Sequence, residues 1–363
     1  MKRRNFLHAA GAGMVLAGCG QEPAQSSAVT DTPTQTYKWK MVTTWPKNFP
    51  GLGTGANNIA RLITEMSGGR IDVTVYGAGE LVPPFEVFDT VSGGTAQLGH
   101  GAAYYWKGKS EAAQFFAAVP FGMNAQEMNA WLAYGGGMEL WAEVYAPFGI
   151  IPVVAGNSGI QMGGWFNREI NSADDLKGLK MRIPGLGGEV LKRAGGTPVS
   201  MPGSDIFTSM QTGAIDATEW VGPYNDLAFG LHKVAKHYYY PGWHEPGTTM
   251  ECLINQEAYE SLPADLQSIV MNACRVVNAD MLAEYTARNN KALQTLINEH
   301  NVDVRPFPDA VLEKLKTLSE EVVAEIANRD TLSAKVFDSY RSFQQQVMQW
   351  HDISERVYMN VRG

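Results

Sequence analysis

Apolar residues alternate with polar ones in three short segments near the start of the chain. These segments cover residues 37–44, 71–77 and 97–102, and a period of two is typical of strands. The intervening residues 55–66 and 84–92 repeat apolar side chains at helical spacing. Strands that alternate with helices in this way predict a mostly parallel sheet.

The middle of the chain continues with a second set of elements. Residues 125–145 have a helical pattern that the glycines at 135–137 are expected to interrupt. Residues 150–155 and 159–167 have extended patterns, and the chain is expected to enter a second lobe at about residue 159. A strand at residues 250–255 should return the chain to the first lobe.

The last third of the chain is mainly helical in pattern. Pro263 suits the first position of a helix that continues to about Asn298 without another glycine or proline. At about 1.5 Å per residue, this helix is long enough to span two lobes. A brief strand at residues 302–305 and two helices at 308–328 and 332–357 should follow.

These elements predict an α/β chain with two lobes, a ligand cleft between them, one long helix across both, and extra C-terminal helices. The expected division assigns residues 37–158 and 250–305 to lobe I, residues 159–249 to lobe II, and residues 306–363 to the C-terminal helices.

The N-terminus has the features of an export signal. Basic residues at 2–4 precede an apolar run at 6–16 that is too short to span a bilayer. Residues 3–7, Arg-Arg-Asn-Phe-Leu, fit a twin-arginine signal, and an ordinary secretory leader is the alternative. Residues 1–19 therefore predict export to the periplasm.

The signal ends in Leu-Ala-Gly followed by Cys19, which predicts acylation of Cys19 and a lipoprotein anchor. The alternative is a cysteine that lies near the cleavage site by chance. Residues 20–36 have no hydrophobic period and consist mostly of Ser, Thr, Pro, Gln and Ala, so they are expected to form a flexible linker.

The net charge bears on the partners of the protein, and the cysteine positions bear on whether it contains a disulfide. The formal net charge is −8, and removal of residues 1–18, which carry three basic and no acidic residues, makes it −11. An acidic body argues against nucleic acid as a partner. Cys252 and Cys274 lie in apolar segments and are expected to be buried free thiols, with a disulfide as the alternative.

Two strand ends between residues 175 and 223 carry opposite charges. In the segment Gly-Leu-Lys-Met-Arg-Ile-Pro, apolar positions alternate with Lys180 and Arg182, so a strand should direct Arg182 away from the buried face. Glu219 and Trp220 close a second short strand. Ligands of open α/β sheets bind beyond the carboxyl ends of strands, so these ends predict a small-anion site. For Arg182, the alternative is a surface ion pair with Asp174, Asp175 or Glu189.

Four motifs occur in order between residues 177 and 216: a Lys-Gly-Leu-Lys-x-Arg strand, a small-residue helix, a proline before an acidic helix start, and a Gln-x-Gly-x-Ile-Asp turn. They occupy residues 177–182, 187–194, 202–205 and 211–216. From about residue 37 onward, the chain resembles the solute-binding proteins of TRAP (tripartite ATP-independent periplasmic) transporters, whose pattern contains these four motifs.

One departure from the commoner pattern points to a branch of that family. Dicarboxylate-type members have an Asn-Pro pair where this chain has Glu-Trp-Val-Gly-Pro at 219–223. With residues 161–165 and 242–247, this segment resembles the branch that binds 2-oxo and 2-hydroxy monocarboxylates together with a metal ion.

The resemblance implies the two-lobed periplasmic-binding-protein fold. It also implies a solute-binding subunit that captures a pyruvate- or lactate-like anion and delivers it to TRAP membrane permease subunits. The binding subunit of an ABC importer, or a sensor for another organic anion, is the alternative.

The resemblance also implies a cation site that includes two glutamates. Glu219 and Glu245 lie in aromatic, glycine-rich surroundings, and two carboxylates brought together would repel unless a cation lies between them. With the side-chain oxygen of Gln161 and the carbonyl of Trp220, they are the expected ligands of Ca²⁺ or Na⁺. Two independent solvated acids are the alternative.

Aromatic residues are the remaining candidates. Tyr104 and Tyr105 follow a strand of the first lobe, and one of them is expected to contact the ligand carboxylate from the opposite wall. Trp165 and Trp220 are expected to shape the slot for the apolar part of the ligand, with core packing as the alternative.

An enzyme is not expected, because the chain has no HExxH, GxSxG or P-loop sequence and no pair of histidines at helical ligand spacing. The last helix has an aromatic and apolar stripe that should dock on its own body or on a second copy of the chain, so a homodimer is possible. The stripe consists of Val336, Phe337, Tyr340, Phe343, Val347, Trp350 and Val357.

Overall fold

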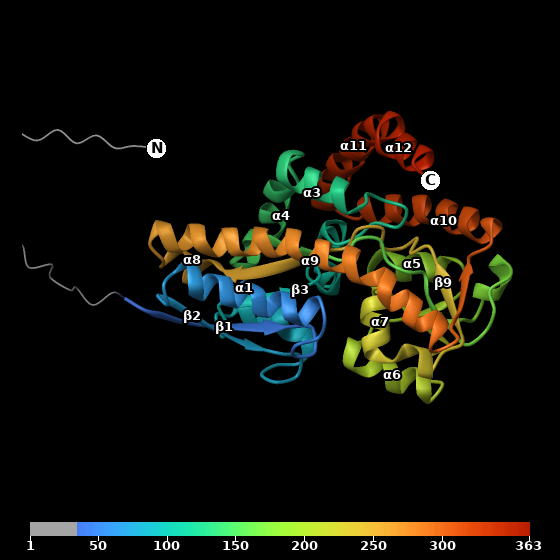
Figure 1. Cartoon of the computed structure of the whole chain (residues 1–363). Coiled ribbons are helices and arrows are strands. Elements are labelled where there is room, and N and C mark those ends of the chain that lie inside the picture. The colour runs from blue at the N-terminus through green and yellow to red at the C-terminus, as the bar shows by residue number, and fades with distance from the viewer. Residues whose placement is uncertain (1–34) are drawn as a thin grey trace, which may run out of the picture. The chain divides into compact units, whose positions relative to one another are not determined.

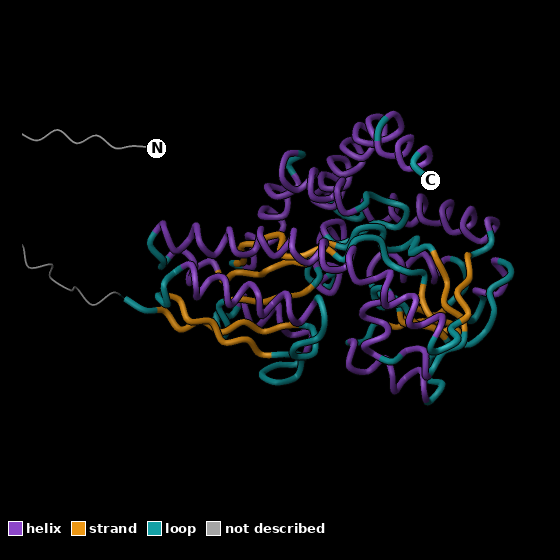
Figure 2. Tube along the Cα trace, in the orientation of Figure 1, coloured by secondary structure: helices purple, strands orange, loops and turns teal. Residues whose placement is uncertain are grey.

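The computed structural model describes residues 35–363. The predictions for the export signal, the twin-arginine sequence, Cys19 and nearly all of the linker therefore lie outside the described residues. Within the described part, the strands form two separate sheets, which Figure 2 shows as two groups. The mixed α/β class predicted from the sequence is confirmed.

The first sheet has five strands in the order β2-β1-β3-β10-β4. β1 lies parallel to β2 and β3, whereas β10 lies antiparallel to both β3 and β4. All seven residues of β10 are buried, including Glu251, whose carboxylate accepts a hydrogen bond from the Tyr145 hydroxyl at 2.9 Å. The strands are β1 (Tyr37–Thr43), β2 (Ile71–Tyr76), β3 (Leu98–Gly101), β4 (Ile150–Asn157) and β10 (Thr249–Asn255).

The helices between these strands follow the sequence-based expectation closely. The predicted interruption at residues 135–137 is confirmed, because Gly136 adopts a left-handed conformation with φ 84° between α3 and α4. Asn124 and Glu127 form a capping box that starts α3. The helices are α1 (Leu52–Met66), α2 (Val87–Ser92), α3 (Ala125–Tyr134) and α4 (Gly137–Tyr145).

The second sheet has six short strands in the order β11-β9-β5-β8-β6-β7. β6 lies parallel to both β7 and β8, so the carboxyl ends of these three strands meet at one edge. The strands are β5 (Gly164–Phe166), β6 (Lys180–Arg182), β7 (Thr197–Val199), β8 (Ala217–Thr218), β9 (His237–Tyr240) and β11 (Asp303–Pro306). The helices that connect them are α5 (Gly185–Arg193), α6 (Gly203–Gln211) and α7 (Pro223–Phe229).

One boundary predicted from the sequence is wrong. Residues up to 305 were expected in lobe I, but β11 pairs in parallel with β9 in the second sheet. Its pairing begins with Asp303 opposite His237. A four-residue strand has too little pattern to specify its partner, and β9 offers it an open edge where α9 ends.

The long helix α9 extends over Ala264–Asn298, and its predicted extent is confirmed. It packs against α1 and β4 of the first sheet and against α7 beside the second, so it spans both sheets (Figure 1). The short helix α8 (Gln256–Glu260) precedes it. Cys274 of α9 and Cys252 of β10 belong to the same buried cluster. Both are free thiols without a disulfide among the described residues.

Three helices close the chain: α10 (Asp309–Ala327), α11 (Thr331–Ile353) and α12 (Glu355–Val361). The single helix predicted over 332–357 is wrong at Ser354, where ψ is −96° and the helix ends. The first part of α11 docks on the body, because Tyr340 is buried and its hydroxyl accepts a hydrogen bond from the Met123 amide at 2.6 Å. Among residues 35–363, none of the helices has the length and apolar content needed to cross a membrane.

Candidate ligand and cation site

Two neighbouring strands of the second sheet place the charged residues that the sequence analysis singled out. Arg182 is the last residue of β6 and pairs with Thr218, the last residue of β8. Glu219 follows directly, and its amide donates to the Arg182 carbonyl at 3.2 Å. The strand ends therefore bring Arg182 and Glu219 together at the edge where ligands of α/β sheets bind.

Arg182 is buried, with only 1% of the residue exposed. Its Nη1 forms an ion pair with Oε1 of Glu219, its Nη2 donates to the Tyr105 hydroxyl at 3.2 Å, and its Nε donates to the Met201 carbonyl at 3.2 Å. The Trp220 ring lies 5.2 Å from the guanidinium carbon.

The alternative of a surface ion pair for Arg182 is wrong. Asp174 pairs with Lys177 and Glu189 pairs with Lys107, so the nearby acids already have other partners. The alternation of residues along β6 indicated that the Arg182 side chain points to the opposite face of the strand from Met181. It did not indicate burial, because the opposite face of this strand end is also covered.

Gln161 and Glu245 come from two loops that lie side by side. The Gln161 amide nitrogen donates to Glu245 Oε2 at 2.8 Å and to the Thr248 hydroxyl at 3.2 Å. The Thr248 hydroxyl also donates to Glu245 Oε2, at 2.6 Å. Because the amide nitrogen of Gln161 faces these groups, its Oε1 is left without a hydrogen-bond partner among the described residues.

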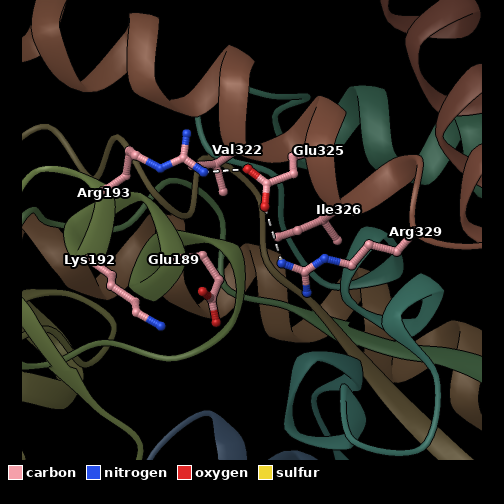
Figure 3. Close-up of a pocket in the computed structure, with 7 residues that line it drawn as sticks. All are labelled: Glu189, Lys192, Arg193, Val322, Glu325, Ile326 and Arg329. Carbon is pink, nitrogen blue, oxygen red and sulfur yellow. Dashed lines mark hydrogen bonds and ion pairs between the residues drawn. The ribbon is translucent and has the colours of Figure 1, made fainter.

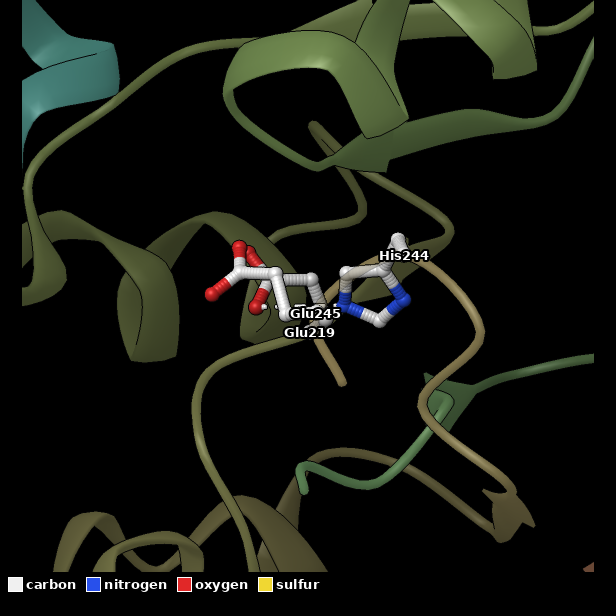
Figure 4. A group of neighbouring side chains, drawn as sticks. All are labelled: Glu219, His244 and Glu245. Carbon is white, nitrogen blue, oxygen red and sulfur yellow. Dashed lines mark ion pairs between the residues drawn. The ribbon is translucent and has the colours of Figure 1, made fainter. Parts of the chain in front are cut away.

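The carboxylates gather around a histidine that the sequence analysis did not place in the site. One donor atom each from Glu219, His244 and Glu245 lie within 4.8 Å of one another, and all three residues are buried (Figure 4). The Nε2 atom of His244 is 3.6 Å from Oε2 of Glu219. The available signal was the position of His244 directly before Glu245, in the loop 242–247 already associated with the site.

The electrostatics of this cluster favour a cation. Burial, and then the charge of Glu219, raise the pKa of Glu245 to about 8. Oε2 of Glu219 and Oε1 of Gln161 are both buried without a hydrogen-bond partner among residues 35–363, which costs free energy. Unpaired carboxylate and amide oxygens are the ligands that hard cations prefer, so the donor set fits Ca²⁺ or Na⁺.

The raised pKa leads to a prediction for cation binding. Since Glu245 without a cation keeps its proton below about pH 8, binding of Ca²⁺ should release that proton. Affinity should therefore rise by up to about tenfold per pH unit from about pH 6 to pH 8 and level off above. Calorimetric titration in buffers of different ionisation enthalpy measures both quantities. A constant affinity over this range, without proton release, would contradict the prediction.

Tyr105 reaches the cluster from the first lobe, through its hydrogen bond with Arg182. Burial raises its pKa, so the hydroxyl keeps its proton and can donate. Tyr104 does not bond Arg182, and its ring packs edge-on against Tyr105 with centroids 4.7 Å apart. Of the two candidates, Tyr105 is thus the one in direct contact with the charged groups.

The two tryptophans lie in different surroundings. Trp220 packs against Trp45 and Phe49 of the first lobe, with ring centroids 6.1 and 6.2 Å apart. Trp165 instead stacks on Tyr238 at 4.0 Å and donates to Asp226. The structure therefore places Trp220 beside the cluster and Trp165 in the core of the second lobe, which was the alternative for Trp165.

A separate charged cavity of about 330 Å³ lies between α5 and α10 (Figure 3). Arg193 and Arg329 point from opposite sides toward Glu325, and all three side chains are partly exposed. None of the residues that line this cavity belongs to the buried cluster. These side chains therefore provide matched controls for substitutions in the site.

Two α/β sheets spanned by one long helix, with a buried arginine at the strand ends of the second sheet, are the architecture of a solute-binding protein. The sequence matches family 7 of the bacterial extracellular solute-binding proteins over residues 41–330. The chain belongs to this family, whose members are the solute-binding proteins of TRAP transporters.

Close relatives carry more specific names. The chain is 42% identical to a monocarboxylate 2-oxoacid-binding periplasmic protein from Nostoc sp., over 99% of this chain and 98% of that protein. A TRAP periplasmic solute-binding protein from Pseudoalteromonas atlantica, solved with sodium and pyruvate, is 44% identical with a TM-score of 0.87. A similar protein from Colwellia psychrerythraea, solved with calcium and pyruvate, is 43% identical with a TM-score of 0.87. The match covers 90% of this chain and 99% of each solved chain.

Proposed function

We propose that this chain captures a small 2-oxo or 2-hydroxy monocarboxylate, such as pyruvate or lactate, together with a cation. The observation that carries the proposal is the buried Arg182 paired with Glu219, whose Oε2, like Oε1 of Gln161, has no hydrogen-bond partner among residues 35–363. The names of the relatives from Nostoc, Pseudoalteromonas and Colwellia support the same ligand class.

In the proposed cation site, Gln161, Glu219, Glu245 and the Trp220 carbonyl hold Ca²⁺ or Na⁺. The two glutamates, Arg182 and a bound monocarboxylate together carry a charge of −2, which Ca²⁺ neutralises and Na⁺ halves. Charge balance therefore favours Ca²⁺ over Na⁺ in the liganded site.

Arg182 and Tyr105 are the proposed contacts of the ligand carboxylate. The planar guanidinium offers parallel donors that match a carboxylate, and the Tyr105 hydroxyl adds one from the opposite lobe. Tyr104 supports the Tyr105 ring. Arg182 and Glu219 already form an ion pair. The ligand carboxylate that binds Arg182 and the cation that binds Glu219 must therefore both be accommodated around this pair.

The ligand class is tested by thermal unfolding of the mature protein with 2-oxo acids of increasing chain length, with and without a chelator. At about a hundred times its Kd, a true ligand should add roughly 2.7 kcal/mol to the free energy of unfolding. The chelator should remove most of this gain. If no 2-oxo or 2-hydroxy acid shifts unfolding at millimolar concentration, the ligand assignment is wrong.

We further propose that the protein is exported to the periplasm, is anchored through acylated Cys19, and delivers its ligand to TRAP membrane permease subunits. Family membership and the sequence of residues 1–19 support this location. Mass spectrometry of the mature N-terminus tests the anchor. No catalytic role is proposed, and steady turnover of pyruvate or lactate by the purified protein would overturn this view.

We also propose a homodimer through the end of α11 and α12. Trp350, Ile353 and Val361 are 61%, 73% and 74% exposed, which is unusual for side chains of this size. Light scattering should find the mature protein dimeric, and a chain that ends at Gln349 should be monomeric while keeping the docked part of α11, which includes Val336 and Tyr340. A monomeric intact protein at high micromolar concentration would contradict the dimer.

A further inference from the structure

Glu251 is a buried carboxylate of the first sheet that lies outside the cation cluster. It is fully buried in β10, the strand that follows the loop with Glu245. Both of its oxygens accept hydrogen bonds. Oε1 accepts from the Trp106 indole nitrogen, and Oε2 accepts from the Tyr145 hydroxyl at 2.9 Å. The carboxylate therefore connects two aromatic side chains of the first lobe.

The stability of the core does not explain a carboxylate at this position. Burial raises the pKa of Glu251 to about 8, because the surroundings disfavour the charged form. A hydrophobic residue of similar volume often serves a core as well as a buried charged group, or better. A role in placing its hydrogen-bond partners is the better explanation of Glu251.

One of these partners, Trp106, is adjacent in the chain to a residue of the proposed ligand site. Trp106 is the last residue of a short 3₁₀ helix, Ala103–Trp106, in which Tyr105 precedes it. Its ring is 2% exposed and packs against Tyr105 with centroids 6.0 Å apart. The Tyr105 hydroxyl accepts from Arg182 at 3.2 Å. Because the helix is a single turn, the bond to Glu251 restrains the position of Tyr105 as well.

The backbone of β10 is irregular at Glu251. Its pairing with β4 shifts between Met250 and Glu251 and leaves out Ala155 of β4. Such a β-bulge changes the direction of nearby side chains, and bulges are common beside binding sites. A bulge at this position fits a side chain that has to be aimed at a particular partner.

We propose that Glu251 is a positioning residue of the ligand site, because its hydrogen bond to Trp106 holds the Tyr105 hydroxyl where it can donate to the ligand carboxylate. This inference rests on the proposed function, in which Tyr105 and Arg182 bind that carboxylate. Glu251 has no part in the cluster of Glu219, His244 and Glu245. Ca²⁺ affinity without an organic acid should therefore change by less than about threefold when Glu251 is substituted.

The test compares pyruvate affinity, in the presence of Ca²⁺, between variants of the mature protein. Glu251→Leu removes both hydrogen bonds and should weaken pyruvate binding by about tenfold, the loss expected for one hydrogen bond to a charged group. In a Tyr105→Phe background, the same substitution should change the affinity by less than about twofold, because the hydroxyl through which it acts is absent. A substitution that only loosens the fold would not depend on Tyr105 in this way.

Glu251→Gln is the conservative variant. Its amide offers an acceptor to the Trp106 indole and a donor to the Tyr145 oxygen, so pyruvate affinity should stay within about threefold of the wild type. Tyr340→Phe is the matched control, because it removes a buried hydroxyl of α11 that bonds the Met123 amide. It should lower the unfolding midpoint and leave pyruvate affinity unchanged.

The proposal is overturned if Glu251→Leu binds pyruvate as tightly as the wild type, if its loss is the same with and without the Tyr105 hydroxyl, or if Glu251→Gln loses as much as Glu251→Leu. If Glu251→Leu does not fold, Trp106→Phe decides, since it removes only the indole that Glu251 holds. Its loss must then also depend on Tyr105.

Failure of the ligand assignment is distinguishable from failure of this inference. If the wild type binds no pyruvate, the ligand assignment is wrong, and coupling between Glu251 and Tyr105 is measured in unfolding of the ligand-free protein instead. The absence of coupling there would overturn the positioning role.

Discussion

Arg182→Ala is expected to weaken pyruvate binding by at least about thirtyfold. Removal of one partner from a buried, hydrogen-bonded charge pair costs about 2–5 kcal/mol of binding free energy. Arg182→Lys should lose less, yet still much of the affinity, because a point charge cannot reproduce the planar fork of donors. Calorimetric titration of pyruvate into each variant in the presence of Ca²⁺ measures the effect.

Two controls separate loss of binding from loss of fold. Arg193→Ala removes a partly exposed arginine that pairs with Glu325 in the cavity of Figure 3, and it should leave pyruvate affinity unchanged. Arg182→Ala also leaves Glu219 buried without its ion-pair partner, so its free energy of unfolding should fall by about 3–5 kcal/mol. If a folded Arg182→Ala protein binds pyruvate normally, Arg182 is only a structural partner of Glu219.

Glu219→Gln is expected to lower Ca²⁺ affinity by at least about tenfold and to weaken pyruvate binding through the loss of the cation. Excess Ca²⁺ should restore part of the pyruvate affinity, which it should not do for Arg182→Ala. Glu325→Gln, in the separate cavity, is the matched control. Failure of Glu219→Gln to change the cation dependence of pyruvate binding would remove Glu219 from the proposed cation site.

A double-mutant cycle between Arg182 and Glu219 should show coupling of about 1–3 kcal/mol in the free energy of pyruvate binding. The two side chains form an ion pair in the structure, so their coupling in unfolding experiments says nothing about the ligand. Only the coupling in pyruvate affinity tests whether both act on one carboxylate.

Most of the architecture followed from periodicity and from glycine and proline positions. The extent of α9 was predictable because no residue between Ala264 and Asn298 interrupts a helix. The partner of β11 was not predictable, since four residues carry no information about which sheet edge lies nearest. The break at Ser354 was equally invisible, because serine is tolerated inside helices.

The sequence singled out Arg182, Glu219 and Glu245, which the fold brings together, but it did not indicate their contacts. The alternation of β6 gave the direction of Arg182, but the ion pair with Glu219 depends on the register between β6 and β8. The position of His244 in the site was not predictable, because His244 lies in a loop that contains glycine and proline and has no periodic spacing. Its proximity to Glu219 arises only when that loop folds against the end of β8.

The central claim is that a cation and Arg182 hold one monocarboxylate between the two lobes. The most direct measurement is calorimetric titration of pyruvate into the chelated mature protein, before and after addition of Ca²⁺ or Na⁺. We expect one pyruvate to bind per chain with the cation present, and little or no binding without it. Equal affinity with and without the cation, or no pyruvate binding under either condition, would contradict the account.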